Sequence, residues 1–322
     1  MGFGEWIIVA LLVVAGLIGL HAARLKRGQR LAEAAAPRIG KTTRVPGGAI
    51  HWVESGEGPP IVLIHGLGGQ FRHWTYGVAE KLAPGYRVIS LDRPGAGYSE
   101  RDSDDHAALS TQARMIADFL EAEGIEKPLV VGHSLGGAVT LTLALEHPDK
   151  LSGFALVAPL THPVSKPPEA FAGLGVRSPL MRRALAWTVA VPMARKYAEA
   201  TLAMVFAPEP APDDFVTRGG GVLGLRPRAF VSTSADFVHS TGIAELSPRW
   251  EAIAVPGGVL YGDRDALLDY EEQGAALVSR LPHLDWTVLE GRGHMLPITA
   301  PEETAAFIRR MAERAFAPTP AA

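Results

Sequence analysis

The strongest constraint on the fold is a five-residue run, Gly132-His133-Ser134-Leu135-Gly136, which separates two segments of different periodicity. Residues 129–131 before it are typical of a strand and Leu135–Glu146 after it of a helix, so Ser134 falls on the turn between them. A tight strand-to-helix turn strains the serine backbone and requires glycine on both sides, because a Cβ atom there would clash. The first N–H groups of the helix then point at the serine. We therefore predict that Ser134 is an activated nucleophile; the alternative is a glycine-rich turn with an incidental serine.

Short apolar segments alternate with longer helical ones from about residue 45 onward. The run Ile61–Ile64 is continuously apolar, as expected for a strand buried on both faces. This alternation predicts an α/β fold with a mainly parallel central sheet and helices on both faces. The predicted strands are Ala49–Glu54, Ile61–Ile64, Arg87–Leu91, Leu129–Val131, Gly153–Val157, Gly258–Tyr261 and Trp286–Leu289, and the predicted helices are Thr111–Glu123, Leu135–Glu146, Leu268–Arg280 and Pro301–Arg314.

Composition excludes several classes of protein. Hydrophobic residues make up 47% and charged residues 20% of the 322 residues, enough for a sizeable core. The formal net charge is −3 with no basic stripe, so no nucleic-acid partner is expected. The absence of cysteine excludes disulfides, a cysteine nucleophile and cysteine-ligated zinc. No cofactor and no bound metal are expected.

The first 23 residues differ in kind from the rest. No charged residue occurs from Trp6 to Ala23, and a helix over that run would be about 27 Å long, close to the thickness of a bilayer core. Arg24, Lys26, Arg27 and Arg30 follow it. We therefore predict a single-pass N-terminal transmembrane anchor over residues 1–23, with the membrane as a partner and the catalytic domain on the cytoplasmic side.

Two alternatives to the anchor stay open. A cleaved signal peptide lacks its usual basic start here, since only Glu5 is charged before Trp6, and residues 20–23 make a poor cleavage site. A core helix of a soluble protein would be expected to show a polar face. The following residues, 24–44, are basic and rich in alanine, and we predict a linker there.

The middle of the chain breaks the strand–helix alternation. From about residue 160 to 250 it is rich in Pro, Ala and Arg, with helical segments and no convincing strand, and it is too long for a plain connection. We predict a helical cap insertion at 160–250, lying over the ends of the strands. The core would then consist of a first part, 45–159, and a second part, 251–322.

Three motifs in order resemble the α/β-hydrolase superfamily, from about residue 45 to the C-terminal helix. The first is His65-Gly66-Leu67-Gly68-Gly69 directly after a buried strand, where that family has its oxyanion loop. The second is the turn Asp92–Ser99 after the next strand, and the third is the run around Ser134. The resemblance identifies the insertion as a lid over the active site.

The resemblance also implies the partners of the nucleophile. The family's chain order is nucleophile, acid, histidine, which selects His294 in Gly291-Arg292-Gly293-His294 as the base. The family pattern Gly-x-x-Asp selects Asp265 as the orienting acid, with Asp263 as the alternative. The backbone N–H groups of Leu67 and Leu135 are the expected oxyanion hole, by their positions after His-Gly and after the nucleophile.

The function that follows is a carboxylic ester hydrolase acting on small to medium apolar esters through an acyl-enzyme on Ser134. A serine nucleophile argues against the dehalogenases and epoxide hydrolases of the superfamily, which use aspartate. A carbon–carbon bond hydrolase or a lactonase with the same triad is the alternative. A ligand-binding protein without turnover is a third reading, since fold does not dictate activity.

Overall fold

A nine-stranded sheet forms the centre of the molecule in the computed structural model, which describes residues 3–317. Its strand order is β1-β2-β4-β3-β6-β7-β8-β9, with β5 paired to β2. β1 and β2 are antiparallel to their neighbours, whereas β4, β3, β6, β7, β8 and β9 run parallel. The bounds are β1 Lys41–Val45, β2 Gly48–Ser55, β3 Pro60–Ile64, β4 Arg87–Leu91, β5 Glu100–Arg101, β6 Leu129–His133, β7 Gly153–Val157, β8 Gly257–Gly262 and β9 Asp285–Leu289.

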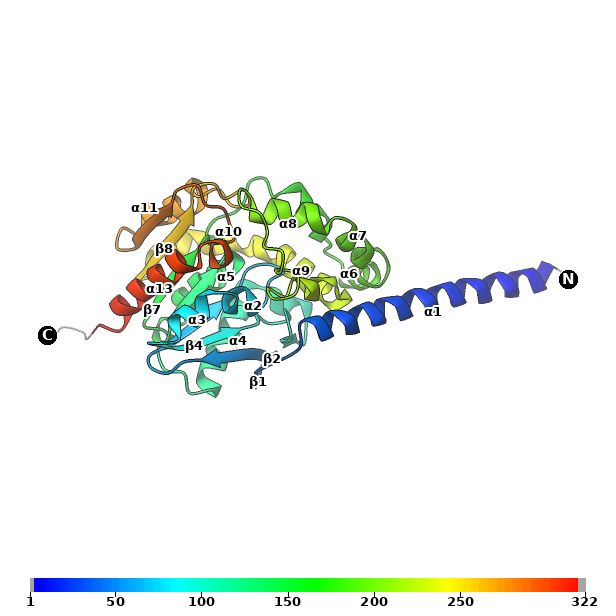
Figure 1. The fold of residues 1–322 in the computed structure, drawn as a ribbon, viewed down its shortest axis with the longest axis horizontal. Helices are drawn as coiled ribbons and strands as arrows, with labels where there is room; N and C mark the ends of the chain where they lie inside the picture. The colour runs from blue at the N-terminus through cyan, green and yellow to red at the C-terminus, as the bar shows by residue number, and fades with distance from the viewer. Residues whose placement is uncertain (1–2, 318–322) are drawn as a thin grey trace.

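Helices cover both faces of this sheet (Figure 1). One apolar layer joins the sheet to α4 (Leu109–Ala122), α5 (Leu135–Glu146), α10 (Ile243–Leu246) and α11 (Ala276–Arg280). The other joins it to α2 (Arg72–Thr75), α3 (Val78–Leu82), α12 (Leu296–Thr299) and α13 (Pro301–Ala315). Short 3₁₀ turns lie at Asp104–Ala107 and Pro148–Lys150. The mainly parallel sheet with helices on both faces, predicted from the sequence, is confirmed.

Between β7 and β8 the described residues form helices and loops and no strand. The longer helices are α6 (Pro179–Leu185), α7 (Val191–Lys196), α8 (Ala198–Phe206) and α9 (Pro227–His239). A π-helical turn, Ala186–Ala190, joins α6 to α7, and 3₁₀ turns lie at Glu169–Leu174, Gly221–Leu225, Ser240–Gly242 and Ser247–Ala252. We call residues 160–250 the cap below; its last helix, α10, is buried with the core of the sheet.

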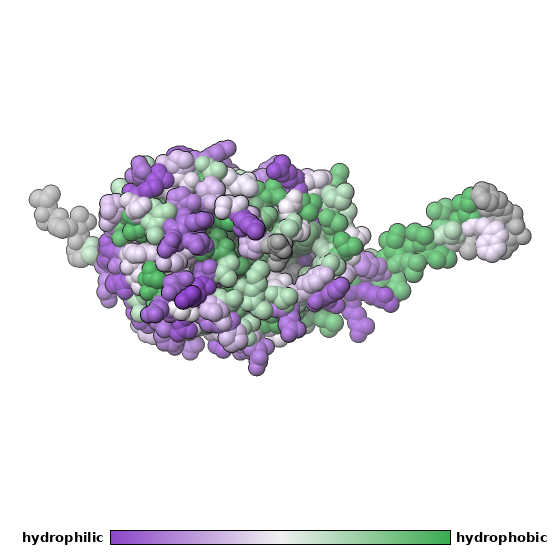
Figure 2. Space-filling view, turned by 90° about the horizontal axis from the view of Figure 1, so that it is seen from above, coloured by the Kyte–Doolittle hydropathy of each residue, from purple (hydrophilic) through white to green (hydrophobic). Residues whose placement is uncertain are grey.

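Helix α1 (Phe3–Ala35) is 33 residues long and projects away from the rest of the molecule (Figure 1). Its last turns are docked, since Leu25, Ala32 and Ala36 are buried. Its first half carries large apolar side chains that stay exposed, and Figure 2 shows it as a mostly hydrophobic rod.

The structure does not support the predicted transmembrane span at 1–23. Among the residues that the structure describes, no helix is both long enough and apolar enough to cross a membrane. Residues 1 and 2 of the predicted span lie outside the described part. The apolar stretch passes without a break into the basic residues 24–30 of the same helix.

Two other local expectations differ from the structure. The linker expected at 24–44 instead continues α1 to Ala35 and then forms most of β1, because Ala, Leu, Glu and Arg favour helix and residues 41–45 pair with β2. The helix expected over Leu268–Arg280 is shorter: a π-helical turn, Glu271–Ala275, precedes α11.

Candidate active site

Ser134 lies at the carboxyl end of β6 in a strained backbone conformation. Its φ of 54° and ψ of −122° are rare for a residue with a side chain. The turn is held by its neighbours: Ser134 N–H donates to the Val157 carbonyl at 3.1 Å. A Cβ atom at Gly136 would collide with the carbonyl oxygens of Ile64 and His65, and one at Gly132 would collide with Gly136. Gly136 is therefore needed for close packing of the turn against the end of β3, and Gly132 for close packing of β6 against the start of α5.

His294 and Asp265 form a buried pair on the loops after β9 and β8. Nδ1 of His294 lies 2.7 Å from Oδ2 of Asp265, and the two side chains are 4% and 0% exposed. The other carboxylate oxygen of Asp265 accepts the N–H groups of Leu267 and Leu268 at 2.8 and 3.0 Å. These three hydrogen bonds fix the orientation of the carboxylate, which holds the imidazole in one tautomer, with the proton on Nδ1.

The alternative acid, Asp263, has a different partner. Its Oδ1 accepts the N–H of Gly291 at 2.6 Å, which closes the turn between the loops after β8 and β9. The geometry thus joins Asp265, and not Asp263, to the imidazole of His294.

His133 connects the serine turn to the histidine loop. Its Nε2 lies 3.0 Å from the backbone carbonyl oxygen of His294, and the two rings are 4.9 Å apart. No hydrogen bond of the described residues joins Ser134 Oγ directly to His294, which is common in enzymes without substrate. Burial lowers the pKa of His133 well below its usual value, so this ring is neutral and its Nε2–H can donate to the carbonyl.

The loop after β3 lies directly over Ser134. A Cβ atom at Gly66 would approach the Ser134 Cβ to 2.8 Å, so only glycine fits there. The next residue is Leu67, and Leu135 is the first residue of α5, where an N–H has no partner inside the helix. Both predicted oxyanion donors therefore belong to the two backbone segments that meet at Ser134.

Arg93 fixes this loop in place through hydrogen bonds, a role that sequence analysis missed. Its Nε and Nη2 donate to the carbonyl oxygens of His65 and Gly66 at 2.9 and 3.1 Å, and its own N–H donates to His65 Nε2 at 2.9 Å. Nη2 is also 2.9 Å from Oδ2 of Asp236, on cap helix α9, and both side chains are buried. Arg101 completes the network at 2.5 Å from Oδ1 of Asp236. The cap is thus tied to the loop beside Ser134.

A second cap contact reaches the histidine loop. Oε2 of Glu209 accepts the N–H of Gly293 at 3.0 Å, one residue before His294. A Cβ atom at Gly293 would overlap the carbonyl oxygen of Ala207, so the cap backbone lies against this position. Sequence analysis gave no role to Glu209.

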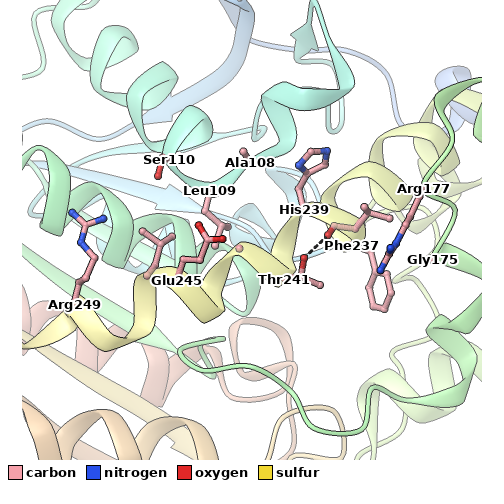
Figure 3. Close-up of a pocket in the computed structure, with 13 residues that line it drawn as sticks. Ala108, Leu109, Ser110, Gly175, Arg177, Phe237, His239, Thr241, Glu245 and Arg249 are labelled. Carbon is pink, nitrogen blue, oxygen red and sulfur yellow. Dashed lines mark hydrogen bonds between the residues drawn. The ribbon is translucent and has the colours of Figure 1, made fainter.

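A large cavity lies away from these residues. It measures about 650 Å³ and lies between the start of α4 and the cap helices α9 and α10, where Leu109, Phe237 and Glu245 line it (Figure 3). A smaller hollow, about 20 Å³, is bordered by Gly68, Gly69 and cap residues that include Asp236. The cap therefore lies beside the loop after β3. Within residues 3–317, no group of three or more His, Asp or Glu could hold a metal ion.

Comparison with known proteins finds a family model and several relatives that match this chain. A family model described as alpha/beta hydrolase fold matches residues 59–301. A 2-hydroxy-6-oxo-6-phenylhexa-2,4-dienoate hydrolase of Comamonas testosteroni is 34% identical over 113 residues, which are 34% of this chain and 40% of that protein. A 2-hydroxymuconate semialdehyde hydrolase of a Pseudomonas species is 32% identical over 154 residues, 47% of this chain and 54% of that protein. The chain spans about half or less of the length of these curated relatives.

Solved structures resemble nearly the whole molecule. An esterase from Thermogutta terrifontis has a TM-score of 0.61 at 25% identity and covers 87% of this chain and 99% of its own. A membrane phospholipase A described as a bacterial virulence factor has a TM-score of 0.65 at 24% identity, over 97% of this chain and 98% of its own. The second likeness concerns the fold alone.

Proposed function

The chain belongs to the alpha/beta hydrolase fold family, and on that basis we propose that it is a serine hydrolase that cleaves carboxylic esters of small to medium apolar substrates. The observation that carries the proposal is the buried pair of His294 and Asp265, 2.7 Å apart, on loops at the sheet edge that also presents the strained Ser134. Nucleophile, base and orienting acid come from the ends of β6, β9 and β8, and an imidazole held by a buried carboxylate is what a serine nucleophile requires.

In the proposed reaction, Ser134 Oγ attacks the ester carbonyl while Nε2 of His294 takes its proton. The imidazolium is stabilised by Asp265, which stays ionised, and then gives the proton to the leaving alcohol. Water, activated by His294, hydrolyses the acyl-enzyme and frees the acid.

We assign the oxyanion hole to the N–H groups of Leu67 and Leu135. The developing negative charge would lie at the N-terminus of α5, a helix of 12 residues whose dipole favours an anion. Each donor of this kind contributes on the order of 3 kcal/mol to the transition state. Arg93 supports the hole indirectly, since it holds the carbonyl groups of the preceding loop residues.

Residues 160–250 are proposed to act as the cap that selects the substrate, because their side chains border the space beside Gly68 and Gly69. A second candidate is hydrolysis of a carbon–carbon bond, which two curated relatives are named for. We favour the ester because the esterase likeness extends over most of the chain, whereas those two matches cover less than half.

A covalent serine probe tests the enzyme class. A fluorophosphonate should label the full chain once, and Ser134→Ala should abolish labelling and lower ester turnover by about 10⁴-fold or more without changing the fold. Labelling that persists in Ser134→Ala would place the nucleophile elsewhere. Parallel assays of nitrophenyl esters and of a vinylogous ring-fission diketone separate the two candidates, since the ester hydrolase should turn over only the former efficiently.

We also propose that α1 brings the enzyme to a membrane, without assigning a span. Leu11, Leu12 and Leu17 are 61–67% exposed, which is unusual for large apolar side chains in water. The side of the membrane stays a prediction, namely the cytoplasmic one.

A further inference from the structure

A second group of exposed apolar side chains lies on the cap, outside the active site. These residues are Leu180, Met181, Trp187, Val189, Met193 and Tyr197, exposed by 81%, 54%, 41%, 52%, 46% and 49%. All of them come from one continuous stretch, α6 to the end of α7, and we call them the cap apolar surface. Single exposed apolar residues are ordinary, but six within 18 residues are a concentration that is typical of an interaction surface.

The cap apolar surface adjoins α1 where that helix leaves the body. Nε2 of His21 lies 3.0 Å from the carbonyl oxygen of Thr188, the residue between Trp187 and Val189. About two turns of α1 further on, Gly28 lies against the side chain of Arg195. Figure 2 shows hydrophobic residues on the end of the body from which the apolar rod emerges.

The exposed part of α1 has no polar side facing away from this surface. Residues 11–14 are all more than half exposed, and four consecutive helical residues point in all directions around the axis. A protein groove would cover one stripe of such a helix, whereas lipid can surround it.

Basic side chains border the apolar surface. Arg24, Lys26, Arg27 and Arg30 of α1 are exposed directly after the apolar stretch, and Arg195 and Lys196 are exposed at the end of α7. Clusters of this kind beside an apolar segment attract anionic lipid headgroups. They also oppose contact between two copies of this face, since each copy would bring the same positive charges.

We propose that the cap apolar surface rests on an anionic phospholipid bilayer, with α1 in contact with lipid beside it. The cap, rather than the sheet, would then face the membrane, and Trp187 and Tyr197 would lie at headgroup level, where such side chains are favoured. The inference concerns binding and does not depend on the ester reaction. It is therefore tested without an activity measurement.

The absence of cysteine allows single-site fluorescent labelling of the full chain. Three variants, Leu180→Cys, Leu11→Cys and Val288→Cys, carry the same environment-sensitive dye and are reconstituted in phosphatidylglycerol vesicles with or without a lipid-borne quencher. Val288 is the matched control, because it is also exposed but lies on β9, the edge strand at the opposite end of the sheet from β1. We expect quenching at 180 and 11 and none at 288.

The outcomes separate the alternatives. Quenching at 11 without quenching at 180 would mean that the cap stands away from the bilayer, and quenching at neither position would mean that this face does not contact lipid; either result overturns the proposal. A change in the dye's emission at position 180 that grows with protein concentration in the absence of lipid would indicate that two copies of the chain meet at this surface. That result would also overturn the proposal. We expect the full chain to bind phosphatidylglycerol vesicles at least about tenfold more tightly than phosphatidylcholine vesicles. High salt should abolish this preference, which would support the charge argument.

Discussion

Replacing Asp236 by asparagine removes the only negative charge that bridges the guanidinium groups of Arg93 and Arg101 in the described network. Arg93 and Asp236 are 0% and 1% exposed, and Arg101 is 5% exposed. Asp236→Asn keeps the shape and one acceptor oxygen but leaves two buried positive charges without their counter-charge. Loss of one partner of a buried ion pair costs about 3–5 kcal/mol, a large part of the 5–15 kcal/mol that typically holds a domain folded.

Urea unfolding followed by circular dichroism measures this loss. With an m-value of about 3 kcal/mol per M, the midpoint of Asp236→Asn should fall by about 1–2 M relative to the unchanged protein. Asp213→Asn, an exposed acidic residue of the same cap, is the control and should shift the free energy of unfolding by less than about 0.5 kcal/mol.

A double-mutant cycle then tests the cause. Adding Arg101→Leu removes one of the two orphaned charges, so the double variant should be more stable than the sum of the single effects predicts. If Asp236→Asn unfolded at the same urea concentration as the Asp213→Asn control, the reasoning about a buried, charge-balanced clamp would be refuted.

Three further results are expected. Asp265→Asn should lower kcat by about 10⁴-fold, because the imidazole is no longer held in the tautomer with its proton on Nδ1. Asp263→Asn should retain most activity. If steady-state kinetics showed the larger loss for Asp263→Asn, the two residues would exchange roles. Glu209→Gln, which weakens the acceptor for Gly293, should lower kcat more than it changes the free energy of unfolding, and equal effects on both would show a merely structural bond. Burial holds the pKa of His65 well below 6.5, so as pH falls below 6.5 the unfolded chain binds a proton that the native chain does not yet bind, and stability falls until the lower pKa of the native chain is reached. In urea titrations His65→Gln should reduce this slope by about 1.4 kcal/mol per pH unit, and an unchanged slope would contradict the argument.

Much of the sheet could be predicted because its signals are local. The continuous apolar run at Ile61–Ile64 is strand β3, and the glycines around Ser134 mark the turn where β6 meets α5. The prediction failed to recognise strand β1, whose partner is set by the fold and not by its own alternation, and it ended the first helix too early. Residues 24–35 favour helix, yet the sequence analysis predicted a basic linker there. Their burial depends on contacts with the cap, which is far away in the sequence.

The residues of the proposed triad and the residues that support them differ in the same way. Asp265 and His294 follow strands in a known chain order, so their positions in sequence already carry information, and the contact at 2.7 Å agrees with that order. The positions of Asp236 and Glu209 in the sequence carry no such information. An aspartate on a helix and a glutamate after a proline are common, and their roles arise only when the cap packs against the core. Arg93 had one possible signal, its place in the turn after β4, but its contacts to His65 and Gly66 depend on packing between loops.

The two cap contacts also limit how a substrate reaches Ser134. Both contacts lie beside the loops that flank Ser134, one at Gly66 and the other at Gly293. Opening at α9 would break the buried pair of Arg93 and Asp236, at about 3–5 kcal/mol. Opening at Glu209 would break its hydrogen bond to Gly293 and its ion pair with Arg292, 3.7 Å away. It would also separate Phe206 and Phe215 of the cap from Met295 and Ile298, with which they form a buried apolar cluster. Each of the two cap contacts is therefore costly to break, and together they hold the cap against the loops on both sides of Ser134.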